Sequence, residues 1–174
     1  MKNISTSILI FLGEKIAKNY LSQNNVFAYP TFREIRKILG KHCKDPRQVV
    51  NAIYYLKARK YIKIKKVKNV RYVYLTTLGA IQFVKISSLF LDKKLTDGKK
   101  SIVIISIPQK KRKSRDFIIR KLKSEKVQKI TKSIYLSNYQ FSPNFYLLVR
   151  LFQLENYLVL GDFQEQGRFQ ERVQ

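Results

Sequence analysis

One short segment of the sequence concentrates side chains that can pair with the edges of nucleic-acid bases. A helical wheel of residues 46–60 groups Val49, Ile53 and Leu56 on one side as apolar anchors. The opposite side carries Arg47, Gln48, Asn51, Tyr54 and Tyr55. Arg, Gln and Asn can each form two hydrogen bonds at once with guanine or adenine. This face is therefore predicted to read bases in the major groove of a duplex. The simpler alternative is a face that is only solvated.

The residues that follow this segment are strongly basic. Residues 57–71 contain eight Lys or Arg and no Asp or Glu. Alternating apolar residues on both sides of Asn69 predict a β-hairpin, and Ile62, Ile64 and Val67 are expected to pack inward. Outward lysines would hold phosphates, which adds affinity and salt dependence but no base preference. The predicted phosphate contacts are Thr31, Arg33, Arg36, Lys41, Lys44, Lys63, Lys65, Lys66, Lys68 and Arg71.

The composition of the whole chain agrees with a polyanionic partner. Its 174 residues include 36 Lys or Arg and 11 Asp or Glu, a formal net charge of +25, and 45% are hydrophobic. A charge of this size in a folded protein favours nucleic acid as the partner. A single cysteine (Cys43) and a single histidine (His42) exclude a disulfide framework and a cysteine zinc site, and we expect no catalytic residue, metal site or cofactor. The early apolar run from Ile8 to Leu12 is too short to cross a bilayer, so a cytoplasmic protein with no membrane association is expected.

Three helices must precede the hairpin, and one must follow it. Apolar spacing predicts helices at residues 5–20, 31–39, 46–60 and 77–90. Three helices and a hairpin form the layout of a winged helix-turn-helix, in which the third helix enters the major groove. We place this predicted DNA-binding domain at residues 1–90.

Capping signals mark two of these helices. Thr31 and Glu34 have the spacing of a capping box, and Gly40 is placed to end the same helix. Asp45 is predicted to cap the next helix, with Pro46 in its first turn. These signals set the start of the helix that carries the predicted reading face.

The second half of the chain has a different order of elements. A polar segment at 91–100, with Gly98 as its turn residue, is predicted to link to a second domain at 101–174. The predicted elements are a strand (101–107), a basic helix (109–125), two short strands within 127–138, a helix from Ser142 and a strand (157–163). The order βαββαβ is that of ferredoxin-like domains, so the predicted fold class is α+β. The basic run from Lys110 to Arg115 is either a second phosphate-binding surface or a solvated helix face, and the solvated face is narrowly favoured.

Residues 97–141 resemble the middle domain of the PaaX-type transcriptional repressors. In that family a winged helix precedes a ferredoxin-like domain similar to the small CRISPR-associated spacer-integration nuclease. The shared features are an Asp-Gly-Lys approach, an Ile-Pro strand end, a basic helix start and a Lys-Ser-aromatic strand, found here at Asp97 to Lys99, Ile107-Pro108, Lys110 to Asp116 and Lys132, Ser133, Tyr135. The resemblance implies a regulator that binds DNA and forms a homodimer through its ferredoxin-like domain.

Two departures from the family pattern affect the expected activity. Ser106 stands where the family strand has an Asp, the carboxylate that holds a divalent metal in the related nucleases. A serine hydroxyl is a poor ligand for a hard cation, and Asp116 is expected to be a structural charge partner in a basic helix. The chain also ends near the close of the ferredoxin-like unit, whereas PaaX-type repressors continue into a further domain. Nothing in the residues supports carrying over their acyl-coenzyme A ligand.

The function that best fits these patterns is sequence-specific binding of double-stranded DNA by a transcriptional regulator. Repression from an inverted-repeat operator, bound by a homodimer, is the predicted mode, and a small-molecule effector is left open. Two alternatives remain at this point. One is a metal-dependent nuclease or an accessory protein of DNA integration. The other is an architectural protein that binds DNA without base preference.

Overall fold

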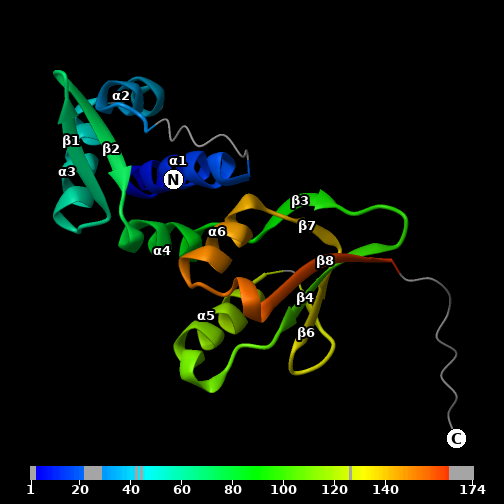
Figure 1. Ribbon diagram of the computed structural model, residues 1–174. Coiled ribbons are helices and arrows are strands. Elements are labelled where there is room, and N and C mark those ends of the chain that lie inside the picture. The colour runs from blue at the N-terminus through cyan, green and yellow to red at the C-terminus, as the bar shows by residue number, and fades with distance from the viewer. Residues whose placement is uncertain (1–2, 22–28, 42, 44, 126, 165–174) are drawn as a thin grey trace, which may run out of the picture.

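The computed structural model describes residues 3–21, 29–41, 43, 45–125 and 127–164. The chain has an α+β fold, in which a unit of helices with a long hairpin stands beside a unit built on a sheet (Figure 1). The first unit contains α1 (Ile4–Leu21), α2 (Phe32–Gly40), α3 (Arg47–Ala58), β1 (Ile62–Val67), β2 (Val70–Leu75) and α4 (Thr77–Ile86). This order of helices and hairpin is compatible with the predicted winged helix-turn-helix.

Helix α2 begins with the predicted capping box. The Thr31 hydroxyl accepts the Glu34 backbone N–H at 3.1 Å, and the Glu34 carboxylate accepts the Thr31 backbone N–H at 2.7 Å. These hydrogen bonds, from the backbone and the hydroxyl of Thr31, hold the pKa of Glu34 below its ordinary value. The predicted end of the helix is wrong by one residue, because Gly40 is still helical and Lys41, with a right-handed φ of −63°, is the C-cap.

Helix α3 begins at Arg47 and is anchored as the wheel predicts. The Asp45 carboxylate accepts the Arg47 backbone N–H at 2.8 Å, although Pro46 occupies the N-cap position. Val49, Ile53 and Leu56 are buried, together with apolar residues of α1, in one core. Burial of this stripe leaves the opposite side of α3 facing outward.

Strands β1 and β2 form an antiparallel hairpin that runs from the pair Ile62–Leu75 to the pair Val67–Val70. Its two turn residues, Lys68 and Asn69, have φ values of 44° and 63°, the left-handed conformation that tight hairpin turns favour. A bridge between Thr31 and Tyr72 ties the hairpin to the start of α2.

The prediction for one hairpin side chain is wrong. Val67 is 49% exposed instead of packed inward. Because side chains alternate along a strand, Lys66 shares a face with Ile62 and Ile64, whereas Val67 lies with Lys63. The apolar residue thus falls on the lysine side of the strand.

The second unit has ferredoxin-like topology. Its elements are β4 (Lys99–Ile105), α5 (Arg112–Lys123) after a short 3₁₀ turn, β5 (Gln128–Lys129), β6 (Ile134–Ser137), α6 (Pro143–Leu151) and β8 (Leu158–Gln164). The sheet order is β5-β6-β4-β8, and every neighbouring pair is antiparallel. The predicted βαββαβ order is therefore confirmed.

A second, two-stranded sheet extends this unit. Strand β3 (Phe90–Lys94) pairs with β7 (Tyr139–Phe141), and the chain then turns at Asp97 and Gly98, both with positive φ, to enter β4. Part of the segment at 91–100, predicted as a linker, is thus paired strand.

Helix α1 contributes to both cores of the molecule. Its residues Ile8 and Leu12 pack in the first unit, while Ala17 packs with Phe83 of α4 in the core of the second unit. Gly13 lies against the Phe83 ring, so close that a Cβ there would overlap the ring atoms. The two units are therefore joined by packed helices as well as by chain connectivity. Within the described part of the chain, no helix has the length and apolar character to cross a membrane.

Candidate nucleic-acid interface

The predicted reading residues share the outward side of α3. Arg47, Gln48 and Asn51 are exposed, and Tyr54 and Tyr55 are 47% and 50% exposed. The buried stripe of α3 lies on the other side of the same helix. Three side chains able to pair with bases therefore occupy the first two turns, the part of a recognition helix that reaches base edges.

Neighbouring side chains brace the two tyrosines. The Tyr54 ring lies 6.2 Å from the ring of Phe32, the first residue of α2. The Arg59 guanidinium lies 5.4 Å from the centre of the Tyr55 ring. Sequence reasoning did not identify Phe32, and it counted Arg59 only among the basic residues of 57–71, although the four-residue spacing of Tyr55 and Arg59 was a usable signal for their contact. The rings of Tyr54 and Tyr55 therefore lie against neighbouring side chains beside Arg47, Gln48 and Asn51 on the outward side of α3.

The hairpin, here called the wing (residues 62–75), presents cations on both of its faces. Lys63 and Lys65 lie over the Tyr74 ring, with their Nζ atoms 5.8 and 5.7 Å from its centre. Lys66 lies directly opposite Arg71 on the other face, a cross-strand pair of like charges. Such a pair opposes hairpin formation in the free protein and becomes favourable when an anion lies between the two groups.

A groove of about 490 Å³ lies between the start of α2 and the tip of the wing. Its lining brings together Arg33 and Arg36 of α2 with Arg71 of the wing, three predicted phosphate contacts from two segments that are far apart in the sequence. Thr31 and Phe32 line the same groove, which places it next to the braced Tyr54 ring. Three guanidinium groups around one opening form a site suited to a phosphate.

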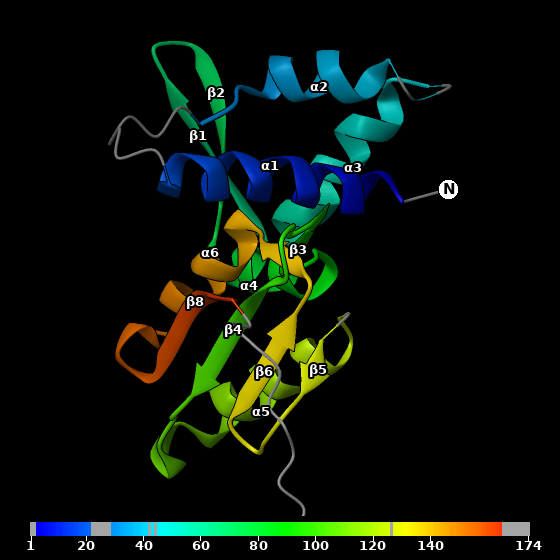
Figure 2. The same cartoon turned by 90° about the vertical axis from the view of Figure 1, so that its right-hand side faces the viewer.

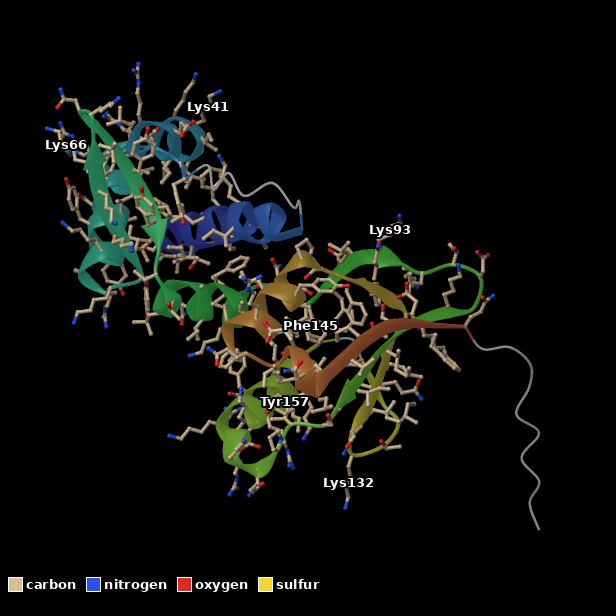
Figure 3. The ribbon with its side chains drawn as sticks, in the orientation of Figure 1. Lys41, Lys66, Lys93, Lys132, Phe145 and Tyr157 are labelled. Carbon is tan, nitrogen blue, oxygen red and sulfur yellow. The ribbon has the colours of Figure 1, made fainter. Side chains whose placement is uncertain are left out.

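The remaining predicted phosphate contacts are more dispersed. Lys41 is exposed at the end of α2, and Lys66 projects near the wing tip (Figure 3). Lys68 is exposed in the wing turn, whereas Lys44 lies outside the described residues, as does His42. Cys43 is half-buried, and its thiol donates to the Leu39 carbonyl at 3.3 Å.

The charge of this surface is unbalanced over a long stretch of sequence. Residues 46–91, which include α3, the wing and α4, contain no Asp or Glu. The nearby carboxylate of Glu34 is occupied by its capping hydrogen bonds to Thr31. The reading face and the wing therefore form one cationic surface that suits a polyanion.

Ser106 and Asp116, the two residues considered for metal binding, both have partners within the protein. The Ser106 hydroxyl donates to the Tyr157 carbonyl at 3.3 Å, and Asp116 pairs with Arg112 at 3.6 Å in the first turns of α5. The described residues contain no cluster of three His, Cys, Asp or Glu side chains able to hold a metal ion.

Comparison with known proteins bears on the second unit. A search of curated proteins finds no match to this chain. A family model described as the PaaX protein central Cas2-like domain matches residues 93–172, from within β3 to beyond the end of β8. The match agrees with the ferredoxin-like topology, and it shows that residues 93–172 are similar to the central Cas2-like domain of PaaX proteins.

Proposed function

We propose that this protein is a sequence-specific, double-stranded DNA-binding transcriptional regulator that acts without catalysing a reaction. The observation that carries the proposal is the outward side of α3, where Arg47, Gln48 and Asn51 are exposed beside a basic wing. The PaaX-like match of residues 93–172 supports the same class of protein. In this proposal α3 reads bases, two copies form a homodimer, and binding represses transcription.

The two groups of side chains have different tasks in this proposal. Arg47, Gln48 and Asn51 pair with base edges and set the preferred sequence. The wing lysines and the arginine groove bind phosphates and release counterions, which adds affinity to every duplex alike. The groove at the start of α2 holds the backbone while α3 lies in the major groove.

The open face of the sheet supports a homodimer. Helices α5 and α6 cover one face, and Figure 2 shows strands β4, β5, β6 and β8 from the other side, with α5 behind them. Alternation and strand register place six apolar side chains on this open face: Ile102, Ile104, Ile134, Leu136, Val159 and Phe163. Val159 is 59% exposed. We expect two copies to bury these faces against each other, because an apolar sheet face of this kind is unfavourable in water.

A two-fold dimer has a consequence for the DNA site. Two α3 helices related by a two-fold axis require half-sites in inverted repeat, spaced by about one helical turn or a multiple, roughly 34 Å per turn. Occupancy of such a site at a promoter blocks transcription, which is the proposed mode of repression. Replacement of Val159 by Lys is expected to shift the protein to monomers in sedimentation velocity, and an unchanged dimer would reject this interface.

Selection of bound sequences from a random duplex pool tests the proposal. The expected result is enrichment of a palindromic consensus, because base reading and two-fold symmetry appear together in one sequence. Enrichment of no sequence would instead favour an architectural protein that binds without base preference. Incubation of labelled DNA with Mg²⁺ or Mn²⁺ tests the non-enzymatic part of the proposal, since cleavage lost in Asp116→Asn would identify a nuclease.

A further inference from the structure

Helix α5 carries basic side chains of two kinds. Three of them have structural partners: Lys111 donates to the Gln153 carbonyl at 2.7 Å, Lys121 pairs with Glu125 at 3.0 Å, and Arg112 pairs with Asp116. Five others, counting the 3₁₀ turn before the helix, are exposed and have no ion-pair partner within the described residues: Lys110, Lys113, Arg115, Arg120 and Lys123. Pairing within the protein therefore does not account for the positive charge of these five side chains.

Helix stability does not explain the five exposed cations. Lys113 and Arg115 lie in the first turn of α5, where positive charge is repelled by the helix dipole, and no acid occupies that turn. Arg120 and Lys123 lie in the last turn, where the helix dipole favours cations, but they are three residues apart, a spacing at which like charges repel. The helix is anchored by Ile118 and Leu122 on its buried side. The helix dipole therefore disfavours Lys113 and Arg115 in the free protein, and a bound polyanion would remove this repulsion and the repulsion between Arg120 and Lys123.

Contacts with α4 hold α5 in place relative to the first unit, which contains α3 and the wing. Lys121 Nζ donates to the Lys85 carbonyl at 3.4 Å. The Glu125 carboxylate accepts the Ser88 hydroxyl at 2.7 Å and the Leu89 backbone N–H at 3.1 Å, just beyond the end of α4. Helix α4 in turn follows β2 directly, and its cap residue Thr76 donates to the Lys60 carbonyl at 2.7 Å. The basic side of α5 is therefore held at a defined place relative to the wing.

The elements with unpaired positive charge lie on one side of the molecule. In Figure 1 the wing, α3, α4 and α5 follow one another along the left side, and in Figure 2 α5 lies behind the sheet while α3 lies above it. Residues 46–91, which include α3, the wing and α4, contain no Asp or Glu, and Lys85 is exposed on α4. Of the two acids near the end of α5, Asp92 and Glu125, the carboxylate of Glu125 is already paired with Lys121.

We propose that α5 is a second phosphate-binding surface, which contacts duplex DNA that flanks the stretch held by α3 and the wing. This inference rests on the proposed function, because α3 and the wing must first hold a duplex. Exposed lysines and arginines recognise phosphates without reading bases. The surface therefore adds affinity only for duplexes long enough to reach α5, and it has no effect on the preferred sequence. The protein thereby binds more DNA than its winged helix alone covers.

Salt titration on duplexes of two lengths tests this surface. Binding is measured by fluorescence anisotropy on random-sequence duplexes of about 12 and about 36 base pairs, roughly one and three helical turns. The test protein carries Lys113→Gln, Arg120→Gln and Lys123→Gln. The matched control carries Lys93→Gln, Lys99→Gln and Lys132→Gln, three exposed lysines outside α5, of which Lys93 and Lys132 are labelled away from it in Figure 3.

We expect the slope of log K against log salt to change only for the α5 variant on the long duplex. On the long duplex the α5 variant lowers the slope of log K against log salt by about 2 to 3 per protomer, about 0.9 for each phosphate that the protein no longer neutralises. On the short duplex the α5 variant changes the slope by less than about 1, as the control does on both duplexes. Equal slopes for the α5 variant and the control on the long duplex would overturn the inference.

Two other outcomes separate this inference from the proposed function. A wing variant, Lys63→Gln with Lys65→Gln, lowers the slope on both duplexes if the proposed function is correct; no effect of this variant would reject the proposed function itself. Loss of binding to single-stranded RNA by the α5 variant, with duplex binding intact, would overturn the inference in favour of an RNA surface. Thermal unfolding of the α5 variant and of the control confirms that both are folded at the temperature of the titrations.

Discussion

Replacement of Lys66 by Glu separates a binding role of the wing from a structural one. Lys66 and Arg71 are directly opposed on neighbouring strands, and both are exposed. The substitution converts a pair of like charges into a pair of opposite charges. Opposite-charge pairs at such positions contribute about 0.2–1 kcal/mol, and the like-charge repulsion is removed at the same time. We therefore expect the hairpin to become more stable.

The effect on DNA binding is expected to have the opposite sign. The new carboxylate removes the cation of Lys66 and engages Arg71, so the wing neutralises about two fewer phosphates. At about 0.9 per phosphate the salt slope falls by about 1.8, which corresponds to roughly 30-fold weaker binding near 0.15 M salt. The stability gain is expected to raise Tm by about 1–4 °C for a protein of this size.

Two measurements on the same variant distinguish the two roles. Thermal unfolding reports stability, and anisotropy with a random duplex reports affinity, with Lys93→Glu on β3 as the control of equal charge change. A variant that is more stable and binds more weakly than the control supports a wing built to hold phosphate. A variant that loses stability and affinity together, or that binds like the control, would refute the reasoning.

Three other substitutions have defined outcomes. Asn51→Ala is expected to cost about 1–3 kcal/mol of binding to the preferred site and to relax base preference at one position, as measured by repeated sequence selection; an unchanged preference would exclude Asn51 from base reading. Gly13→Ala is expected to lower stability by about 1–3 kcal/mol through overlap with the Phe83 ring, and to become neutral or stabilising in a Phe83→Leu background, because alanine favours helix; the same loss in both backgrounds would exclude that contact. Glu34 has a lowered pKa in the folded protein, so its contribution is fully present above its ordinary pKa of 4.5 and is lost as the pH falls through the lower folded value. Urea unfolding of Glu34→Gln against pH is expected to lack this loss, and an identical acid profile would remove the capping carboxylate from the explanation.

Local sequence patterns predicted the helices of the first unit and the outward side of α3. The apolar side of α3 follows from the spacing of Val49, Ile53 and Leu56, because helical periodicity depends only on neighbours in sequence. The capping box of Thr31 and Glu34 is equally local and is confirmed. The order of elements in the second unit followed from the same kind of information.

Features that depend on contacts between distant segments were not predicted. The error at Val67 is different in kind, because strict alternation from Ile62 and Ile64 already places it on the face of Lys63 and Lys65. The pairing of β3 with β7 joins segments that are far apart in sequence, and the charged residues of β3 show no strand alternation. The groove of Arg33, Arg36 and Arg71 and the contact of Gly13 with Phe83 likewise exist only after segments that are distant in sequence pack together.

Methylation interference tests most directly whether α3 reads bases in the major groove. Guanine N7 lies in the major groove, and a methyl group there blocks the pairing proposed for Arg47. On the selected duplex, we predict interference at symmetry-related guanines of the two half-sites, and loss of this interference with Arg47→Ala. Uniform insensitivity to guanine N7 methylation, with interference only from adenine N3 methylation in the minor groove, would contradict the central claim.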